Sequence, residues 1–256
     1  MLKKVAVITG GGSGIGEAAA KRFAKEGIRV CLVDLKKSRA EQVKEKILEE
    51  GGEALVFDVD VSNEEQVTDA LKTIAQKWER IDILFNNAGI NGTLNSIEEM
   101  KADEWDETIH TNLKSTFLMV KHTIPYMKEN GGSMIITSSI NGNRTFSNFG
   151  MSAYSTSKAG QVAFMKMAAL ELAQYHIRVN AICPGAIETN IDQNTEKKKS
   201  VEKIEIPVEY PEGSHPLEQK SGSPKQVADV VYFLASDASS HVTGTAMYVD
   251  GAESLL

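Results

Sequence analysis

The sequence predicts an α/β fold, a doubly wound parallel sheet of about seven strands with helices on both faces. Short apolar runs rich in β-branched residues alternate with longer amphipathic runs, which is typical of parallel strands joined by crossover helices. The first apolar run leads directly into a glycine-rich turn. No linker, internal repeat or low-complexity tract divides the 256 residues, and this length suits one α/β unit. We therefore expect residues 1–256 to form a single domain.

The predicted elements follow in order along the chain. Each strand is a short apolar run bounded by polar residues or glycine. These runs are Val5–Thr9, Arg29–Asp34, Ala54–Asp58, Ile81–Asn86, Ser133–Ser138, Ile177–Cys183 and Thr245–Val249. Each helix shows apolar residues at a spacing of three or four. The helices begin near Gly14, Arg39, Glu64, Leu113, Ala153 and Pro224.

Charge and composition restrict the class of protein. The 28 basic and 35 acidic residues give a net charge of −7, which argues against nucleic acid as a partner and fits a soluble metabolic enzyme. The apolar runs fall short of the roughly 20 residues that a membrane span needs, and no signal-peptide pattern is visible. Cys31 and Cys183 have no disulfide or metal-binding spacing. We expect a cytoplasmic protein without a membrane partner or a catalytic metal.

One long segment departs from the alternation. Between Ala186 and Gly222 there is no strong strand pattern, and the segment contains three prolines and eight acidic residues against five lysines. Long irregular insertions in compact domains are usually lids, binding loops or disordered segments. We expect a substrate lid at about residues 186–222. The run Lys197–Lys199 is interpreted as a solvated face of that lid.

A glycine-rich turn, Gly10-Gly11-Gly12-Ser13-Gly14-Ile15-Gly16, separates the first predicted strand from the first helix. Glycine permits positive φ angles and close approach of the backbone, and the N-terminus of a helix offers N–H groups to an anion. A turn in this context predicts a Rossmann-type site for the pyrophosphate of a dinucleotide. The residues expected to bind it are Gly10, Ser13, Gly14, Ile15 and Gly16.

Asp34 ends the second predicted strand, about 20 residues beyond the glycine turn. A carboxylate at this position can accept hydrogen bonds from the adenosine 2′- and 3′-hydroxyls, and it repels a 2′-phosphate. Lys36 and Lys37 lie close enough in sequence to weaken that repulsion, and no arginine directly follows Asp34. The sequence predicts NAD as the cofactor and leaves NADP as the less favoured alternative.

Tyr154 and Lys158 are one helical turn apart, so they lie on one face of the predicted helix. A tyrosine that acts as a base near neutral pH needs its pKa, ordinarily about 10, lowered by roughly 2–3 pH units. The ammonium of Lys158 and an oxidised nicotinamide would both favour the phenolate. Together with a dinucleotide site, the pair predicts a hydride-transfer enzyme with tyrosine as its general acid/base.

These motifs resemble those of the short-chain dehydrogenase/reductase family along nearly the whole chain. Further segments in the order typical of that family are Asp58-Val59, Asn86-Asn87-Ala88-Gly89, Asn112, Ser138-Ser139, Pro184-Gly185 and Val249-Asp250-Gly251. The resemblance implies an NAD(P)-dependent oxidoreductase that interconverts a secondary alcohol and a ketone.

The resemblance implies four catalytic residues. Tyr154 would exchange a proton with the substrate oxygen, and Lys158 would also bind the nicotinamide ribose. Ser139 resembles the serine that hydrogen-bonds the substrate oxygen, and Asn112 the asparagine that holds a relay water. Ser139 lies further from Tyr154 than the corresponding serine of many relatives, so Ser138 stays open as the alternative.

The same resemblance implies further cofactor-binding residues. Asp58 and Val59 would meet the adenine. The segment Asn87, Ala88 and Gly89 would lie beneath its ribose. The residues that would hold the nicotinamide carboxamide are Pro184, Gly185, Ile187 and Thr189.

The resemblance leaves the substrate open. A small polar alcohol or sugar-like molecule is favoured, with 3-oxoacyl-[acyl-carrier-protein] reductase as the alternative. Carrier-protein reductases often place arginines at the mouth of the site, where this chain has Asn130 and Tyr175, although Lys128 and Arg144 are nearby. A non-catalytic dinucleotide-binding regulator is a third interpretation, but such a protein would be expected to have lost a catalytic residue.

A homotetramer is also implied by the resemblance. Relatives pair their long helices, here near Leu113–Asn130 and Ala153–Tyr175, and add contacts through the C-terminal strand. The second of these helices carries more apolar residues than one sheet face would cover. Those expected at the interface are Phe164, Met165, Met167 and Leu170.

Overall fold

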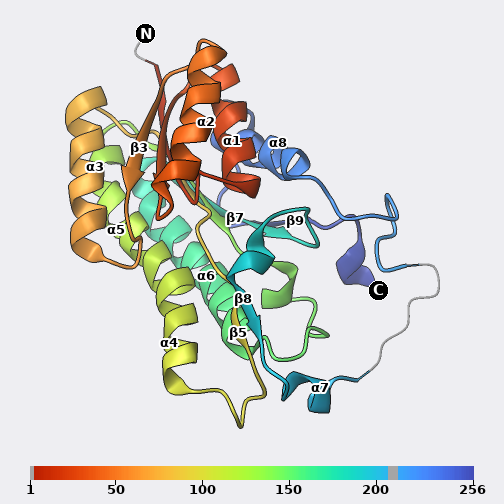
Figure 1. Cartoon of the computed structure of the whole chain (residues 1–256). Coiled ribbons are helices and arrows are strands. Elements are labelled where there is room, and N and C mark those ends of the chain that lie inside the picture. Colours follow the sequence, from red (N-terminus) through yellow and green to blue (C-terminus); the bar gives the residue numbers. More distant parts are fainter. Residues whose placement is uncertain (1–2, 207–212) are drawn as a thin grey trace.

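Seven parallel strands form the central sheet, in the order β3-β2-β1-β4-β6-β7-β9 (Figure 1). The structure, a computed structural model, describes residues 3–206 and 213–256. Winding runs outward in one direction from β1 and in the other from β4, so it reverses between these two strands. The doubly wound sheet predicted from the sequence is confirmed, and the predicted strand ends differ by at most two residues. The strands are β1 (Val5–Thr9), β2 (Arg29–Asp34), β3 (Ala54–Asp58), β4 (Ile83–Asn86), β6 (Gly132–Thr137), β7 (Ile177–Pro184) and β9 (Ala246–Val249).

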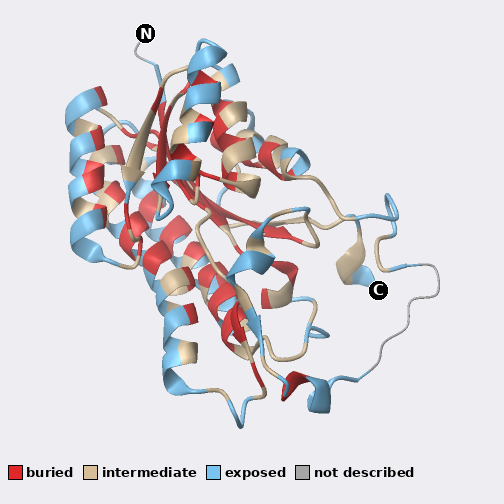
Figure 2. Ribbon diagram, viewed as in Figure 1, coloured by how far each residue is buried: buried red, intermediate tan, exposed pale blue. Residues whose placement is uncertain are grey.

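Helices cover both faces of the sheet and create two cores. Val5 and Val7 of β1 contribute to one core, and Ala6 and Ile8 to the other. Successive side chains of a strand point to opposite faces, so a sheet covered on both sides needs strands that are apolar throughout. Figure 2 shows the result, a buried sheet between helices that are buried on one side only. One face carries α1 (Gly14–Lys25), α2 (Lys37–Glu49) and α8 (Pro224–Ala235), the other α3 (Glu64–Trp78), α5 (Ser115–Met127) and α6 (Ser152–Leu172).

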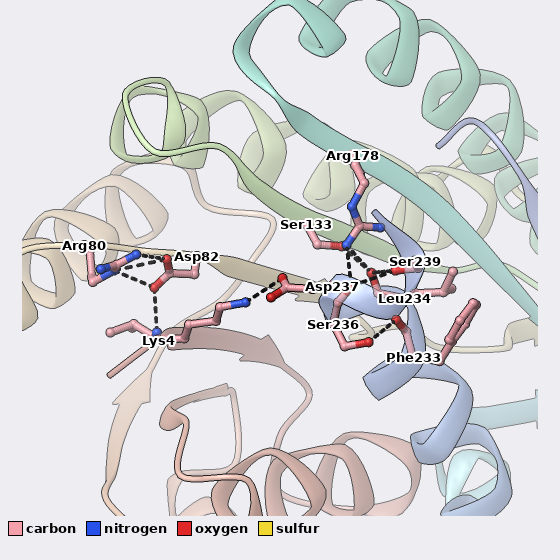
Figure 3. A network of polar contacts seen from close by, with 11 residues as sticks. Lys4, Arg80, Asp82, Ser133, Arg178, Phe233, Leu234, Ser236, Asp237 and Ser239 are labelled. Atoms are coloured by element: carbon pink, nitrogen blue, oxygen red, sulfur yellow. Dashed lines mark hydrogen bonds and ion pairs between the residues drawn. The ribbon is translucent and has the colours of Figure 1, made fainter. Parts of the chain in front are cut away.

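A polar network fastens the end of α8 to the amino ends of the strands (Figure 3). Arg178 of β7 and Ser133 of β6 both donate to the backbone carbonyl of Leu234, each at 2.8 Å. This carbonyl belongs to the last turn of α8, where no further helical N–H is available to it. Lys4, just before β1, pairs with Asp237 at 3.0 Å. The network lies at the amino ends of the strands, whereas the candidate site lies at their carboxyl ends.

The helix predicted to begin near Leu113 starts earlier. It is preceded by α4 (Ala102–Ile109) and a π-helical turn (His110–Lys114), and α5 follows at Ser115. The backbone N–H of Lys101 donates to the Glu104 carboxylate at 3.1 Å and caps the start of α4. Most of α4 is polar and only partly buried, so the apolar spacing that reveals a helix in sequence is weak there.

A second, small sheet pairs β5 (Gly92–Leu94) with β8 (Thr195–Lys197) in parallel. The segment 186–222, which shows no strong strand pattern in the sequence, thus contains one short strand. Three residues are too few for a periodic pattern, and the partner strand lies far away in sequence. The lid also contains the short helix α7 (Val201–Ile204). Pro207 and Pro211, which the sequence analysis counted in the lid, lie outside the described residues.

The apolar residues of α6 do not all face outward. Met165 is fully buried in the core, so its expected place at a subunit interface is wrong. Met167 and Leu170 are 66% and 77% exposed. Phe164 packs edge-to-face on Phe117 of α5, with ring centres 6.2 Å apart. The exposed apolar surface thus spans α5 and α6.

Candidate active site

The predicted site residues gather at the carboxyl ends of the strands, around the reversal of winding between β1 and β4. In open α/β sheets, ligands bind in the crevice outside the strands at this point. The loops after β1, β2, β3, β4, β6 and β7 all end here because the strands are parallel. Asn112 reaches the crevice from the π-helical turn, and Tyr154 and Lys158 reach it from α6.

The turn after β1 is shaped for close backbone approach. Gly10 and Gly14 have φ angles of +64° and +54°, which favour glycine. A Cβ on Gly16 would lie 2.1 Å from the Gly10 carbonyl oxygen, so α1 can begin this close to the turn only with glycine there. Ser13 is the N-cap of α1 in an extended conformation, and Ile15 lies in the first turn. The turn presents the N-terminus of α1, where an anion is stabilised.

Thr9, the last residue of β1, joins the glycine turn to the loop after β4. Its hydroxyl oxygen accepts hydrogen bonds from the backbone N–H groups of Asn87 (2.9 Å) and Ala88 (3.0 Å). The Asn87 side chain donates to the Thr9 carbonyl at 3.3 Å. Thr9 is not among the site residues predicted from the sequence, although a hydroxyl residue immediately before the glycines is a signal for it.

Asp34, at the end of β2, accepts two backbone hydrogen bonds, from the N–H of Gly12 (2.9 Å) and that of Lys36 (2.8 Å). Arg39 lies beside them. Its Cβ and the Asp34 Oδ2 are both 3.0 Å from the point that a Cβ on Gly12 would occupy. Arg39 is not among the residues predicted from the sequence to act on the cofactor preference, because only the first turn of α2 brings it back toward Asp34.

The end of β3 completes this wall of the crevice. Asp58 lies in register with Asp34, and the N–H of Val59 donates to the Asp34 carbonyl at 3.3 Å. Asp58 is exposed and Val59 is buried. The side chain of Asp58 is therefore the one open to a ligand.

Tyr154 and Lys158 lie in the first turns of α6 and are only 8% and 3% exposed. The Lys158 Nζ lies 5.5 Å from the centre of the Tyr154 ring. Burial lowers the pKa of Lys158 to about 8. Burial also raises the pKa of Tyr154, and the adjacent Ser139 side chain opposes that shift. In the protein alone, burial thus outweighs the lowering of the Tyr154 pKa that the sequence analysis expected from Lys158.

The two serines after β6 have different partners. Ser138 donates its hydroxyl hydrogen to the backbone carbonyl of Lys158 at 2.8 Å and so ties α6 to β6. The Ser139 hydroxyl accepts from the N–H of Asn141 at 3.2 Å and lies next to Tyr154. The Ser138 hydroxyl is therefore occupied in joining α6 to β6. Of the two serines, Ser139 is the one whose hydroxyl lies next to Tyr154.

Asn112 is buried, and its side chain makes three hydrogen bonds. Its Oδ1 accepts from the N–H of Ile90 (2.8 Å), and its Nδ2 donates to the Ile90 carbonyl (2.9 Å) and the Ser157 hydroxyl (3.0 Å). π-helical turns such as the one carrying Asn112 occur frequently at functional sites. Its backbone carbonyl accepts from Gln161 at 2.9 Å. Ser157 and Gln161 are not among the site residues predicted from the sequence, although their spacing places them on the face of α6 that carries Tyr154.

Gly89 lies between Asn112 and Lys158. A Cβ on this glycine would be 3.0 Å from the Asn112 Oδ1 and 3.5 Å from the Lys158 Nζ. Glycine therefore keeps the approach to the lysine from the loop after β4 free of a side chain.

The loop after β7 returns to the glycine turn. A Cβ on Gly14 would lie 3.3 Å from the Thr189 Cγ2, so this loop passes across the N-terminus of α1. The N–H of Ala186, which follows Pro184 and Gly185, donates to the Glu253 carboxylate at 2.7 Å. Ile187 pairs with Gly222 in an isolated β-bridge. These contacts fix the loop between the C-terminal segment and the crevice.

The described part of the lid is hydrogen-bonded to residues on both sides of the crevice. On one side, Arg39 of α2 donates to the Gln193 side chain at 2.9 Å. On the other side, Asn91 donates to the Thr195 hydroxyl at 2.9 Å, next to the β5–β8 pair. The lid therefore crosses from α2 to the loop after β4.

Two cavities flank the site. One of about 940 Å³ opens between α1, the start of α8 and residues 188–190, and touches the crevice at Gly14. Another of about 240 Å³ lies beside the start of α6. Within residues 3–206 and 213–256, no three His, Cys, Asp or Glu side chains are grouped to hold a metal ion. No helix in the same part of the chain is long and apolar enough to cross a membrane.

A family model described as enoyl-(acyl carrier protein) reductase matches residues 10–252. The chain belongs to the short-chain dehydrogenase/reductase family. The family resemblance stated from the sequence is confirmed, and the protein is an oxidoreductase of this family.

Known family members resemble the chain over almost its full length. A crystal structure of a 3-ketoacyl-ACP reductase from Sinorhizobium meliloti 1021 is 45% identical with a TM-score of 0.95, covering 98% of this chain and 99% of that one. Levodione reductase from Leifsonia aquatica is 37% identical, covering 98% of this chain and 94% of its own length. A 3-ketoacyl-(acyl-carrier-protein) reductase from Brucella melitensis, complexed with NADH, is 34% identical with a TM-score of 0.86, covering 99% and 100%.

Proposed function

We propose that this short-chain dehydrogenase/reductase interconverts a secondary alcohol and a ketone with NAD(H), and that Tyr154 is its general acid/base. The observation that carries the proposal is the buried pair of Tyr154 and Lys158, with Ser139 beside the tyrosine. A regulator without catalytic function would have no need to keep a lysine buried at an energetic cost next to that ring.

The residues of the crevice fit a nicotinamide dinucleotide. The positive φ angles of Gly10 and Gly14 leave the backbone of the turn open to a pyrophosphate at the N-terminus of α1. The Asp34 carboxylate lies at the end of β2, where it can accept hydrogen bonds from the adenosine ribose. The Brucella melitensis relative, which is complexed with NADH, supports this class of cofactor. When bound, the nicotinamide supplies or accepts the hydride.

Tyr154 would give its phenolic proton to the carbonyl oxygen in reduction and take it back in oxidation. Ser139 would donate a hydrogen bond to the same oxygen. The Lys158 ammonium would stabilise the phenolate that remains, and this interaction is strong because both groups are shielded from water. With a pKa of about 8, Lys158 stays mainly charged at neutral pH yet can pass a proton on.

The path from Lys158 to solvent runs past Gly89 and Asn112. The missing side chain at Gly89 leaves room 3.5 Å from the lysine nitrogen. Asn112 is held by Ile90 and Ser157, so it keeps the loop after β4 at a fixed distance from α6. We infer that Asn112 maintains this space for a relay water that returns protons to Lys158.

A second candidate function is reduction of a 3-oxoacyl thioester on an acyl carrier protein, which the names of the two bacterial crystal structures favour. An acidic carrier protein would need free cations at the mouth of the site. Lys128 stacks on the Tyr175 ring at 4.8 Å, and Arg144 stacks on the Tyr248 ring at 3.4 Å. Both cations would have to give up these aromatic contacts to meet such a partner.

We also propose that the protein is a cytoplasmic homotetramer. Cys31 and Cys183 are free and buried, which suits a reducing compartment. Met167 and Leu170 on α6 are largely exposed. Phe117 on α5 continues this apolar surface, which a second copy of the chain would cover.

The test of the function is a substrate screen with the purified protein. Secondary alcohols with NAD or NADP, and the matching ketones with NADH or NADPH, are followed by the absorbance of the reduced nicotinamide. Acetoacetyl-acyl carrier protein is the additional substrate for the second candidate. Turnover of simple alcohols and ketones supports the main proposal. Turnover of the carrier-protein thioester alone would replace it with the second candidate, and no turnover of any substrate would refute both.

A further inference from the structure

The cavity of about 240 Å³ lies beside the start of α6, the helix that carries the proposed acid/base Tyr154. Ser155, the residue after Tyr154, is part of its wall. One liquid water occupies about 30 Å³, so the cavity can hold a chain or ring of several carbon atoms. Apolar side chains make most of the wall, and these are Ile97, Phe146, Phe149, Met151 and Ile204.

The cavity is linked to the proposed oxyanion-binding serine by a chain of contacts. Asn141 donates its N–H to the Ser139 hydroxyl at 3.2 Å. The side chain of the same asparagine donates to the Met151 sulfur at 3.8 Å. Met151 then faces the cavity. The loop that carries Ser139 therefore also lines the cavity further along, from Thr145 to Met151.

Three small hydroxyl residues (Thr145, Ser152 and Ser155) and two asparagines are the polar residues of the wall, and both asparagine side chains are already engaged within the protein. The Asn95 side chain donates to the Glu99 carbonyl at 3.0 Å, and its oxygen accepts from Ser200. The Asn148 side chain donates to the Asn141 side chain at 2.9 Å. A hydroxyl-rich ligand would have to compete for these groups, and burial of its unpaired hydroxyls is costly.

The outer wall of the cavity is built by the lid and is well supported. Val201, at the start of α7, is buried. A Cβ on Gly150 would lie 2.8 Å from the Val201 Cγ2 and 3.1 Å from the backbone nitrogen of Asn95. The bond between Ser200 and Asn95 joins the same two segments. Ile204, one turn further along α7, is therefore held against the cavity.

Apolar side chains also line its mouth. Ile97 is 81% exposed and Phe146 is 69% exposed. Large apolar side chains grouped around a cavity at a candidate active site mark a surface that an apolar ligand covers.

We propose that this cavity binds the hydrocarbon group of the substrate, so that the enzyme acts on secondary alcohols and ketones carrying a straight-chain or cyclic hydrocarbon group of several carbons. The inference rests on the proposed function and deepens it. It replaces the small polar or sugar-like substrate that the sequence favoured, because most of the surface of the wall is apolar.

The first test measures kcat/KM with saturating NADH for straight-chain methyl ketones from butanone to decan-2-one. Each added methylene should raise kcat/KM about fourfold until the cavity is full, after which the values level off. 5-Hydroxypentan-2-one has the size of hexan-2-one but ends in a hydroxyl, and it should react at least about tenfold less well. The inference would be overturned if kcat/KM did not change with chain length and were equal for 5-hydroxypentan-2-one and hexan-2-one.

Two substitutions should move the preferred chain length in opposite directions. Ile204→Trp fills the cavity, so kcat/KM should level off at shorter ketones than in the unmodified enzyme. Phe149→Ala enlarges the cavity and should shift the plateau to longer ketones. Leu48→Trp is the matched control, since it adds the same bulk to another half-exposed aliphatic residue on α2. Figure 1 shows α2 and α7 at opposite ends of the molecule.

The outcomes separate this inference from the function on which it rests. If no alcohol or ketone is turned over with NAD(H), the proposed function fails. If butanone is turned over but Ile204→Trp and Leu48→Trp have the same chain-length profile, only the assignment of the cavity fails. A shift confined to Ile204→Trp supports it, even if Phe149→Ala does not fold.

Discussion

Lys158 donates from Nζ to the backbone carbonyl of Thr137 across 2.9 Å. The bond joins α6 to the carboxyl end of β6 and holds the lysine nitrogen 5.5 Å from the centre of the Tyr154 ring. A lysine buried in this way is destabilised in its charged form. The same burial that prepares the residue for proton transfer therefore makes the fold sensitive to pH.

We predict that stability rises with pH through the titration of Lys158. Its pKa is about 8 in the folded protein against 10.5 in the unfolded chain. Between these values the unfolded chain binds more protons, so the free energy of unfolding increases with pH, by up to about 3 kcal/mol. Urea unfolding from pH 7 to 10.5 gives the free energy of unfolding of the unmodified protein and of Lys158→Met. The difference between the two proteins should grow with pH. Parallel pH curves for the two proteins would contradict the prediction.

Tyr154→Phe should lower kcat by at least about a hundredfold, because it removes the one hydroxyl that transfers the proton. The binding of NADH should change by less than about twofold, since the ring stays in place. Fluorescence titration with NADH and steady-state kinetics give the two values. Ser138→Ala is the control for a nearby lost hydroxyl. A Tyr154→Phe enzyme that keeps half its turnover would exclude tyrosine as the acid/base.

The Asp34 carboxylate should set the preference for NAD over NADP. Asp34→Ala removes the repulsion toward a 2′-phosphate and should narrow the ratio of the kcat/KM values for the two cofactors by about tenfold or more. Arg39 lies next to the same point of the glycine turn, so we expect it to provide the remaining affinity for NADP. The double variant Asp34→Ala/Arg39→Ala should then lose the gain with NADP. Equal or better use of NADP by the unmodified enzyme would refute the preference.

The exposed apolar face of α5 and α6 should hold the tetramer together. Leu170→Glu places a charge on this face and should yield smaller species in light scattering, where the unmodified protein gives four times the mass of one chain. Leu48→Glu on α2 is the control and should leave the mass unchanged. A monomeric unmodified protein at micromolar concentration would show that another partner or solvent covers this face.

The lid should close over bound ligands. Arg39 holds Gln193 on one side of the crevice, and Asn91 holds Thr195 on the other. Backbone hydrogen exchange across residues 188–197 should slow when NADH and a ketone analogue are both bound. Gln193→Ala should accelerate exchange in this segment without altering exchange in the strands. Exchange rates that stay the same on ligand binding would make the segment a fixed connector.

Local sequence was sufficient for the sheet and for the residue types of the site. A strand such as β1 is buried on both faces, so its apolar character is visible without knowledge of its neighbours. The glycines of the turn, and the spacing of Tyr154 and Lys158 on one helix, are equally local. For that reason their type and spacing can be recognised before the segments that they contact are known.

Tertiary structure alone decided the features that depend on distant segments. The strand β8 has three residues and exists because it pairs with β5 about a hundred positions away. Packing between elements decides the burial of Met165 and the different partners of Ser138 and Ser139. It also decides the proximity of Arg39 to Asp34. The pKa of Lys158 depends on burial between α6 and β6, which periodicity does not measure. Residue order determined the strands and the chemical groups, whereas packing determined their environment, because desolvation and contact arise only once remote parts of the chain meet.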